Sequence, residues 1–246
     1  MIYLGTTQII ETTLKVFKEC HVKSFPIDCM DLLEHYGYRL FTYDNLFLKN
    51  KELYDLCTAC SEDAFRDGTN MIVAYNSHNS KGRIRFSLMH ELGHHVLGHT
   101  GNSDQNEQEA NAFASHILAP RMAIHYSKCK NAEDVSQIFD VSHNAAAIAF
   151  DSYRRWHRRI VTYKMSYIDK LLYGHFYDSE NNCFVWNIKE CSYCGAILYN
   201  SISDHCKACC VPEIDQKRSF VHQIPMYNID MDLFRRLENN WLYGGL

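Results

Sequence analysis

The feature that most constrains this chain is a histidine-rich segment at residues 87–99, SLMHELGHHVLGH. It holds four histidines and one glutamate among apolar residues and glycines. His90 and His94 are four residues apart, which on a helix places both imidazoles on one face, about one turn apart. Imidazoles at this separation suit two ligands of one tetrahedral zinc ion. The segment therefore predicts a helix with two metal ligands, and the fold must bring a third ligand from elsewhere.

Glu91 directly follows His90 and completes an HExxH motif. In this motif the glutamate carboxylate reaches a water molecule on the metal and accepts its proton as a general base. The small Gly93 allows a second element to approach the helix closely. His95 and His99 repeat the four-residue spacing on a neighbouring face, and we interpret them as polar contacts in the interior or at the helix end. Because three fixed residues also occur by chance, the alternative is a histidine run on a solvated helix face.

A second helix is expected at residues 106–119, NEQEANAFASHILA, where Pro120 stops it. Glu107 and Asn111 share one face of this helix, whereas Glu109 points about 200° away from Glu107. Only one of the two glutamates can therefore face the metal. In glutamate-type metallopeptidases the third ligand is a glutamate followed four residues later by Asp or Asn, which orients a histidine ligand. This spacing favours Glu107 as the third ligand and leaves Glu109 as the alternative.

Three stretches, NMIVAYNS, RIRFSLMHELGHHVLGH and NEQEANAFASHILAP, together resemble the ImmA/IrrE metallopeptidases of bacterial mobile elements and stress regulators. The resemblance covers roughly residues 25–150. It implies zinc ligands at His90, His94 and Glu107 and a general base at Glu91. It also implies an intracellular endopeptidase, several relatives of which cleave a helix-turn-helix repressor.

Hydrophobic periodicity gives an α+β pattern around these motifs. It predicts helices at residues 6–20, 27–36, 45–66 and 83–99 and strands at residues 38–43 and 70–76. We expect a zincin-like, mostly helical metallopeptidase core with a small β-sheet over residues 1–160, followed by a C-terminal region at 161–246. The rival hypotheses are a non-catalytic, zinc-containing regulator with a peptidase-like fold that binds DNA or protein, and a toxin or antirestriction component.

Residues 133–150 resemble part of a helix-turn-helix, and YRRWHRRI follows directly. Arg154, Arg155, Arg158 and Arg159 form two four-residue rows on one helix face, which suits phosphate contacts. The alternative is a solvated basic face that completes the peptidase core. The formal net charge is −4, so DNA binding is the less favoured interpretation.

Eleven cysteines form the second strong signal. Cys191-x2-Cys194 and Cys206-x2-Cys209 are two knuckles whose four thiolates can converge on one structural zinc ion. Residues 186–212 are therefore predicted to form a zinc ribbon, with Gly195 at a position that often needs a positive φ. Cys57 and Cys60 are interpreted as buried free thiols on a helix.

The remaining features set the cellular context. The N-terminus lacks a basic start and a continuous apolar run, so no signal peptide is expected. No apolar segment approaches the roughly 20 residues that cross a bilayer. Reduced, metal-binding thiols then favour a cytoplasmic protein. A terminal helix is expected within residues 213–246.

Overall fold

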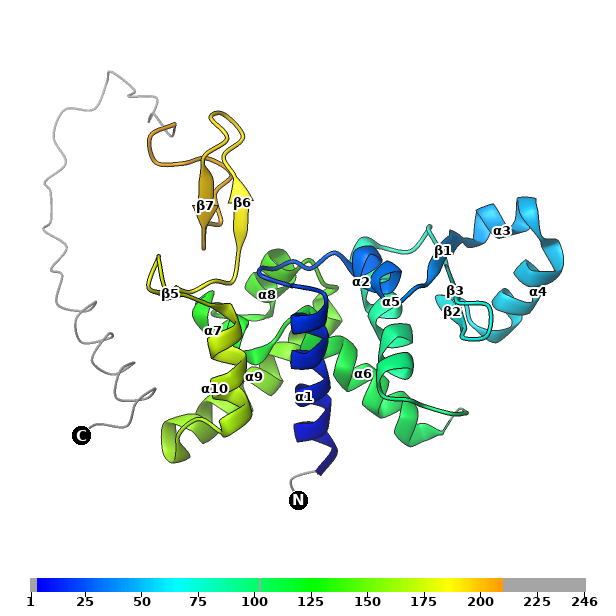
Figure 1. Ribbon diagram of the computed structural model, residues 1–246, viewed down its shortest axis with the longest axis horizontal. Coiled ribbons are helices and arrows are strands. Elements are labelled where there is room, and N and C mark those ends of the chain that lie inside the picture. Colours follow the sequence, from blue (N-terminus) through cyan, green and yellow to red (C-terminus); the bar gives the residue numbers. More distant parts are fainter. Residues whose placement is uncertain (1–3, 102, 210–246) are drawn as a thin grey trace, which may run out of the picture.

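The computed structural model describes residues 4–101 and 103–209 and is mostly helical (Figure 1). Its helices are α1 (Leu4–Glu19), α2 (Cys29–His35), α3 (Tyr43–Lys49), α4 (Lys51–Cys60), α5 (Lys81–Val96), α6 (Asp104–Leu118), α7 (Arg121–Tyr126), α8 (Ala132–Phe139), α9 (His143–Tyr163) and α10 (Tyr167–Phe176). Its strands are β1 (Arg39–Thr42), β2 (Ala64–Asp67), β3 (Ile72–Tyr75), β4 (Tyr177–Asp178), β5 (Cys183–Phe184), β6 (Ile188–Glu190) and β7 (Ile197–Tyr199). The predicted α+β class is confirmed. The expected terminal helix lies outside the described residues.

The predicted helix at residues 45–66 is confirmed only in part, because the segment forms two helices, α3 and α4, and its end is not helical. Asn50 ends α3 and caps α4, because its backbone is extended and its side-chain oxygen accepts from the N–H of Leu53 at 3.1 Å. The last part of the segment is the strand β2. Beyond β2 the Asp67 carboxylate accepts from the N–H groups of Thr69 and Asn70 and turns the chain into β3. The sequence DGTN was therefore a hairpin signal.

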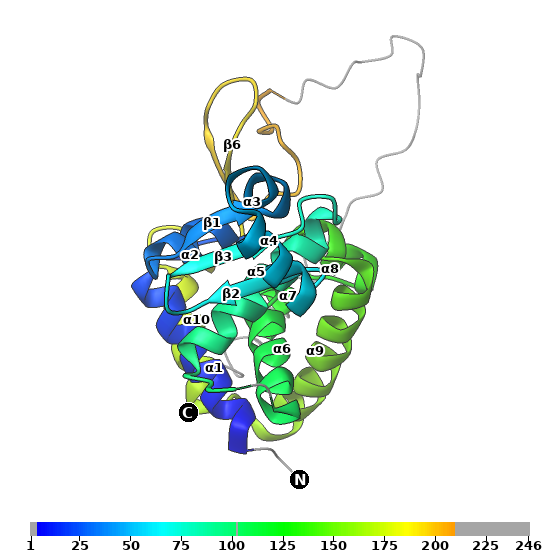
Figure 2. The ribbon, with the colours of Figure 1, turned by 90° about the vertical axis from the view of Figure 1, so that its right-hand side faces the viewer.

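A three-stranded sheet in the order β1-β3-β2 lies over α5 (Figure 2). β1 runs parallel to β3, and β2 runs antiparallel to β3 with Arg66 opposite Val73. Val73 and Ala74 of the central strand are fully buried. β2 is consequently an edge strand, and it runs along the helix that carries the HExxH motif.

Helices α5 and α6 pack closely because Gly93 has no side chain. A Cβ atom at Gly93 would lie 3.0 Å from Cδ1 of Phe113 and 3.2 Å from the Cα of Ala110. Phe113, Ala110 and Leu92 are themselves fully buried at this contact. The predicted close approach is confirmed, and it sets the two helices near enough for side chains on both to meet.

One buried cluster joins the N-terminal helix to residues just before β6. Phe17 contacts Phe25 and Phe176 with ring centroids 5.8 and 5.2 Å apart. Phe184 and Trp186 belong to the same cluster. Side chains from both sides of residue 160 thus share this core, while the division of the chain at that residue stays a prediction.

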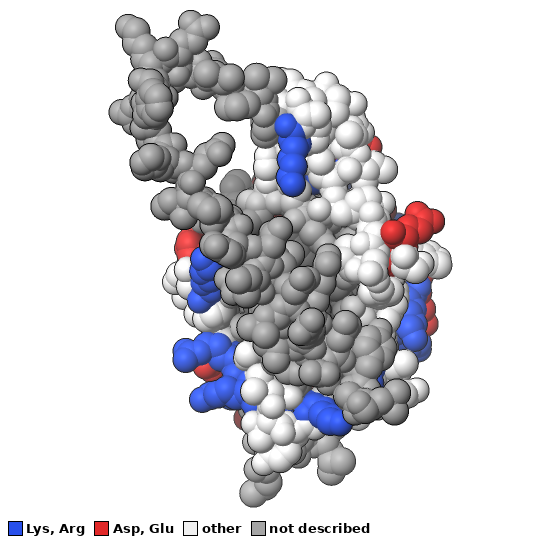
Figure 3. All heavy atoms as spheres, turned by 90° about the vertical axis from the view of Figure 1, so that its left-hand side faces the viewer, with Lys and Arg blue, Asp and Glu red and all other residues white. Residues whose placement is uncertain are grey.

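Helices α8 and α9 pack together in the region that resembles a helix-turn-helix. Asp140 joins them in a left-handed conformation, and Ser142 caps α9. The four arginines of α9 are exposed. On the face drawn in Figure 3, the visible Lys and Arg side chains form separate groups with acidic residues among them.

β6 and β7 form an antiparallel ribbon that stands to one side of the helical body (Figure 1). Gly195, between them, has a φ of +71°, as the sequence suggested. Within residues 4–101 and 103–209, none of the helices combines the length and the apolar character that crossing a bilayer requires.

Candidate metal centres and active site

Three side chains predicted as metal ligands meet where α5 faces α6. The Nε2 atoms of His90 and His94 lie 3.0 Å apart. The Glu107 carboxylate reaches both, at 3.2 Å from His90 Nε2 and 3.4 Å from His94 Nε2. The close packing at Gly93 brings the second helix within this range. Of the two candidate glutamates, Glu107 is the one that faces the histidine pair, and Glu109 faces away.

The outer contacts of the two histidines leave both Nε2 atoms available to a cation. The Nδ1 atom of His90 lies 3.0 Å from Oδ1 of Asn111, so a neutral His90 donates there and keeps a lone pair on Nε2. His94 also uses its Nδ1 atom elsewhere, at 3.1 Å from His99 Nδ1. When His94 carries its hydrogen on Nδ1 as well, two lone pairs and a carboxylate converge, an arrangement that a positive ion stabilises.

The donor set fits zinc. A tetrahedral ion with bonds of about 2.0–2.1 Å separates its ligand atoms by about 3.3 Å, close to the three distances here. Burial, with a further contribution from His90, lowers the pKa of His94 to about 4. This imidazole is therefore neutral near pH 7 and keeps the electron pair that a metal bond requires.

Glu91 lies in the same cleft but is not one of the three converging groups. The cleft has a volume of about 420 Å³ and is lined by parts of β2, α5 and α6. Burial raises the pKa of the Glu91 carboxyl to about 7; Arg66 opposes this rise and Glu107 adds to it. A carboxyl group with a pKa near the working pH suits general acid–base chemistry.

Arg66 is a cleft residue that the sequence interpretation missed. Its Nε atom lies 3.8 Å from Oε2 of Glu91, and its Nη1 donates to the Tyr38 hydroxyl at 3.3 Å. The Tyr38 hydroxyl in turn contacts Nδ1 of His95 at 3.0 Å. Placing residue 66 in a helix hid this position, and the hairpin signal in DGTN was the clue. The interpretation of His95 as an interior polar contact agrees with the structure.

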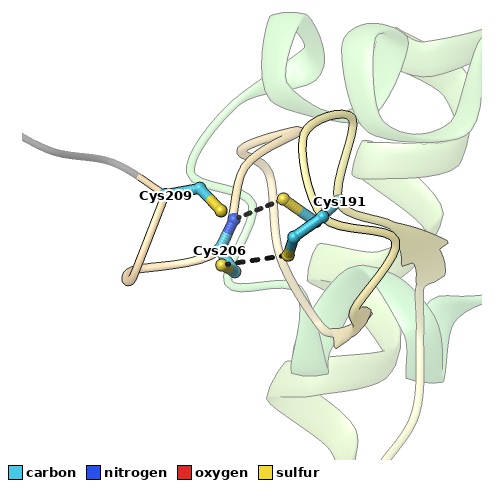
Figure 4. Close-up of side chains that lie close together, drawn as sticks. Cys191, Cys206 and Cys209 are labelled. Atoms are coloured by element: carbon cyan, nitrogen blue, oxygen red, sulfur yellow. Dashed lines mark hydrogen bonds between the residues drawn. The ribbon is translucent and has the colours of Figure 1, made fainter.

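A second group of candidate ligands lies at the end of the ribbon. The sulfur atoms of Cys191, Cys194, Cys206 and Cys209 all lie within 4.8 Å of one another. The sulfurs of Cys194 and Cys206 are 3.7 Å apart, and tetrahedral zinc with bonds near 2.3 Å separates its sulfurs by about 3.8 Å. Figure 4 shows Cys191, Cys206 and Cys209 turned toward one another.

Backbone N–H groups prepare one of these thiols for metal binding. The N–H of Cys206 lies 3.3 Å from Cys191 Sγ. Hydrogen bonds from the backbone of Cys206, Cys194 and Tyr193 lower the pKa of the Cys191 thiol to about 6. These hydrogen bonds therefore favour the thiolate form of Cys191, which is the form that binds zinc. This cluster is compatible with the predicted ribbon.

The prediction that Cys57 and Cys60 are buried free thiols on a helix is confirmed only in part. Both thiols are free and both lie on α4, but Cys57 is buried whereas Cys60 is exposed. Burial raises the pKa of Cys57, which suppresses thiolate chemistry there. No group of three or more metal-binding side chains among the described residues includes this pair.

Comparison with known proteins agrees with this geometry. Residues 48–151 match the model of the IrrE N-terminal-like domain, the Peptidase_M78 family. The match begins later than the expected resemblance from residue 25, but it contains β2, β3, α5 and α6. A search of curated proteins finds no match to the chain. The family supports a zinc metallopeptidase type of function. Over residues 48–151 the chain is therefore similar to the IrrE N-terminal-like domain, which agrees with the resemblance to the ImmA/IrrE metallopeptidases.

Proposed function

We propose that this protein is a zinc-dependent endopeptidase whose active site is the cleft between β2, α5 and α6. The observation that carries this proposal is the convergence of His90 Nε2, His94 Nε2 and the Glu107 carboxylate in the cleft that also holds Glu91. His90, His94 and Glu107 would hold the zinc ion. Two neutral imidazoles and one carboxylate leave a fourth tetrahedral position open, as catalytic zinc sites require.

When bound, the zinc ion supplies Lewis acidity that activates water and polarises the scissile carbonyl group. Glu91 takes the proton from the attacking water and passes it to the nitrogen of the departing amine. The water oxygen forms the new bond to the carbonyl carbon, and the bond between carbon and nitrogen breaks. Arg66 lies next to Glu91 and favours its ionised form, which is the form that accepts the proton.

Cys191, Cys194, Cys206 and Cys209 would hold a second zinc ion with a structural role. Four thiolates complete a tetrahedral shell and leave no open position for a substrate. So small a ribbon buries little apolar surface, so a bound metal is expected to supply much of its stability. The proposed cofactors are thus one catalytic and one structural zinc ion.

The proposed substrate is a helix-turn-helix repressor whose cleavage releases a mobile element or a stress response. The resemblance of this sequence to the ImmA/IrrE metallopeptidases supports this choice. Cytoplasmic action is part of the proposal, and the free thiols of the described cysteines support it. DNA binding through the arginines of α9 is the less favoured alternative, because the formal net charge of the chain is −4 and one of these arginines, Arg155, pairs with Asp151.

Glu91→Gln tests the mechanism. Glutamine keeps the size of the side chain but cannot accept the proton. Cleavage of a repressor encoded beside this gene should fall by roughly 100- to 10,000-fold, while zinc content and melting temperature stay near wild type. The measurement is co-incubation of purified protein and repressor, followed by mass spectrometry of the fragments.

Glu11→Gln is the matched control, because Glu11 is an exposed residue of α1 and the same chemical change there should leave cleavage intact. If the biological activity of the protein survives Glu91→Gln unchanged, the non-catalytic regulator becomes the better account.

A further inference from the structure

The end of α5 places His99 beside His94. Leu97 ends the helix and Gly98 follows with a φ of +69°. The N–H of Gly98 donates to the carbonyl of His95 at 3.1 Å, and the N–H of His99 donates to that of His94 at 3.0 Å. These two bonds form a Schellman motif, in which the residue after the glycine commonly makes an apolar contact with the residue five positions earlier. Here that pair consists of two histidines.

The side chains continue this contact as a line of hydrogen bonds. His99 Nδ1 lies 3.1 Å from His94 Nδ1, and His99 Nε2 lies 3.1 Å from Oε2 of Glu109. The other Glu109 oxygen accepts from Gln105 Nε2 at 2.8 Å. Only 6% of the His99 side chain is exposed. We call the three residues His94, His99 and Glu109 the histidine chain.

The hydrogen positions in the histidine chain follow from its two ends. His94 Nε2 faces His90 and Glu107, so a lone pair is needed there and the hydrogen of the neutral ring sits on Nδ1. His99 Nδ1 must then accept, which leaves the His99 hydrogen on Nε2. That hydrogen is donated to Glu109, because a carboxylate only accepts. Each hydrogen therefore has one acceptor, and the chain runs in one direction.

We propose that His99 and Glu109 are positioning residues for the zinc ligand His94. They fix its ring orientation and its tautomer, and the negative charge at the end of the chain increases the basicity of His94 Nε2. The inference rests on the proposed function in one respect, namely that His94 binds zinc. His90 has a separate outer partner in Asn111. Each histidine ligand thus has a separate outer partner. Asn111 orients His90, and His99, which is bound to the Glu109 carboxylate, orients His94.

This assignment also gives Glu109 a role that differs from ligation. His99 touches the nitrogen of His94 that points away from Glu107, so neither His99 nor Glu109 belongs to the three converging groups. Partners of this kind typically contribute 10- to 100-fold, roughly, to metal affinity. Their loss should weaken zinc binding without abolishing it.

The test is the zinc affinity of the full chain, measured by competition with a chelator. His90→Ala protein serves as the baseline, because the zinc that it still binds is the zinc bound by the ribbon. His99→Leu should weaken binding at the α5–α6 site by roughly 10- to 100-fold, and Glu109→Gln should weaken it by less. His99→Asn should recover part of the loss, since its side-chain oxygen can accept from His94 Nδ1. His95→Leu is the matched control and should leave the affinity unchanged, because His95 contacts Tyr38 instead.

The outcomes separate the two proposals. Wild-type affinity in both His99→Leu and Glu109→Gln, with zinc lost in His90→Ala, would overturn the positioning role and leave the metal site standing. Zinc retained at wild-type stoichiometry in His90→Ala would overturn the metal site itself. An equal loss in His95→Leu and His99→Leu would trace the effect to damage of the helix and would also overturn the positioning role. If His99→Leu fails to fold, Glu109→Gln and His99→Asn carry the comparison.

Discussion

At the scale of single residues, the site depends on which atom of each side chain points inward. His90 and His94 both present Nε2, and in each ring Nδ1 contacts a separate outer partner. The choice between Glu107 and Glu109 follows from the same geometry. Glu107 approaches both ligand nitrogens, whereas Glu109 contacts His99 and Gln105.

Glu107→Gln and Glu109→Gln form a pair that tests this choice. Glu107→Gln removes a charged ligand and should cut zinc affinity at the α5–α6 site by much more than the 10- to 100-fold, roughly, that an outer partner contributes. The loss of zinc affinity caused by Glu109→Gln should be smaller than that range. The check is chelator competition on both variants side by side. The opposite order, with the larger loss in Glu109→Gln, would mean that the wrong glutamate has been assigned as ligand.

The four-residue spacing was enough to predict the facing histidines and to favour Glu107, because one helix fixes the relative directions of its own side chains. Arg66 and the chain through His99 were not predictable in this way. Arg66 reaches the cleft only through the pairing of β2 with β3, and His99 reaches His94 only through the turn at Gly98. The positions of Arg66 and His99 both depend on where a helix ends or a turn begins, which the spacing of residues within one helix does not report.

At the scale of elements, the contact between α5 and α6 determines whether ligands from two helices can meet. Gly93 is the point of closest approach, and Phe113 and Ala110 fill the opposite side. The error at residues 45–66 belongs to this scale. Apolar periodicity continues across Asn50, but the cap formed by its side chain and the hairpin after β2 divide the segment. Periodicity alone does not report such interruptions.

Gly93→Ala should destabilise the protein by about 1–3 kcal/mol, because the added methyl group overpacks the buried contact. It should also weaken zinc binding, since the ligands lie on both helices. Gly174→Ala is the matched control in α10, where an added Cβ meets no described atom within 4 Å. That change should stabilise the protein by about 0.4–1 kcal/mol. Urea unfolding of both variants measures the two effects, and equal stability changes would refute the close-packing argument.

At the scale of the whole molecule, the two candidate metal centres lie in different parts of the fold. One lies between α5 and α6, and the other lies at the end of the ribbon. The ribbon joins the body through the backbone bond from Phe25 N–H to the Trp186 carbonyl at 2.9 Å and through Asn187 Nδ2, which donates to the Phe25 carbonyl at 2.8 Å. The two sets of ligands share no residue, so each should load with metal independently.

Zinc content per chain tests the central claim most directly. Elemental analysis of native protein purified without chelators should find close to two zinc ions per chain. His90→Ala should lose one of them, and the double substitution of Cys191→Ser and Cys194→Ser should lose the other while the first remains. As a check, wild-type protein is incubated with excess zinc and the unbound metal is removed. If the wild-type protein then still holds a single zinc ion, and His90→Ala has the same zinc content, the proposed catalytic centre is contradicted.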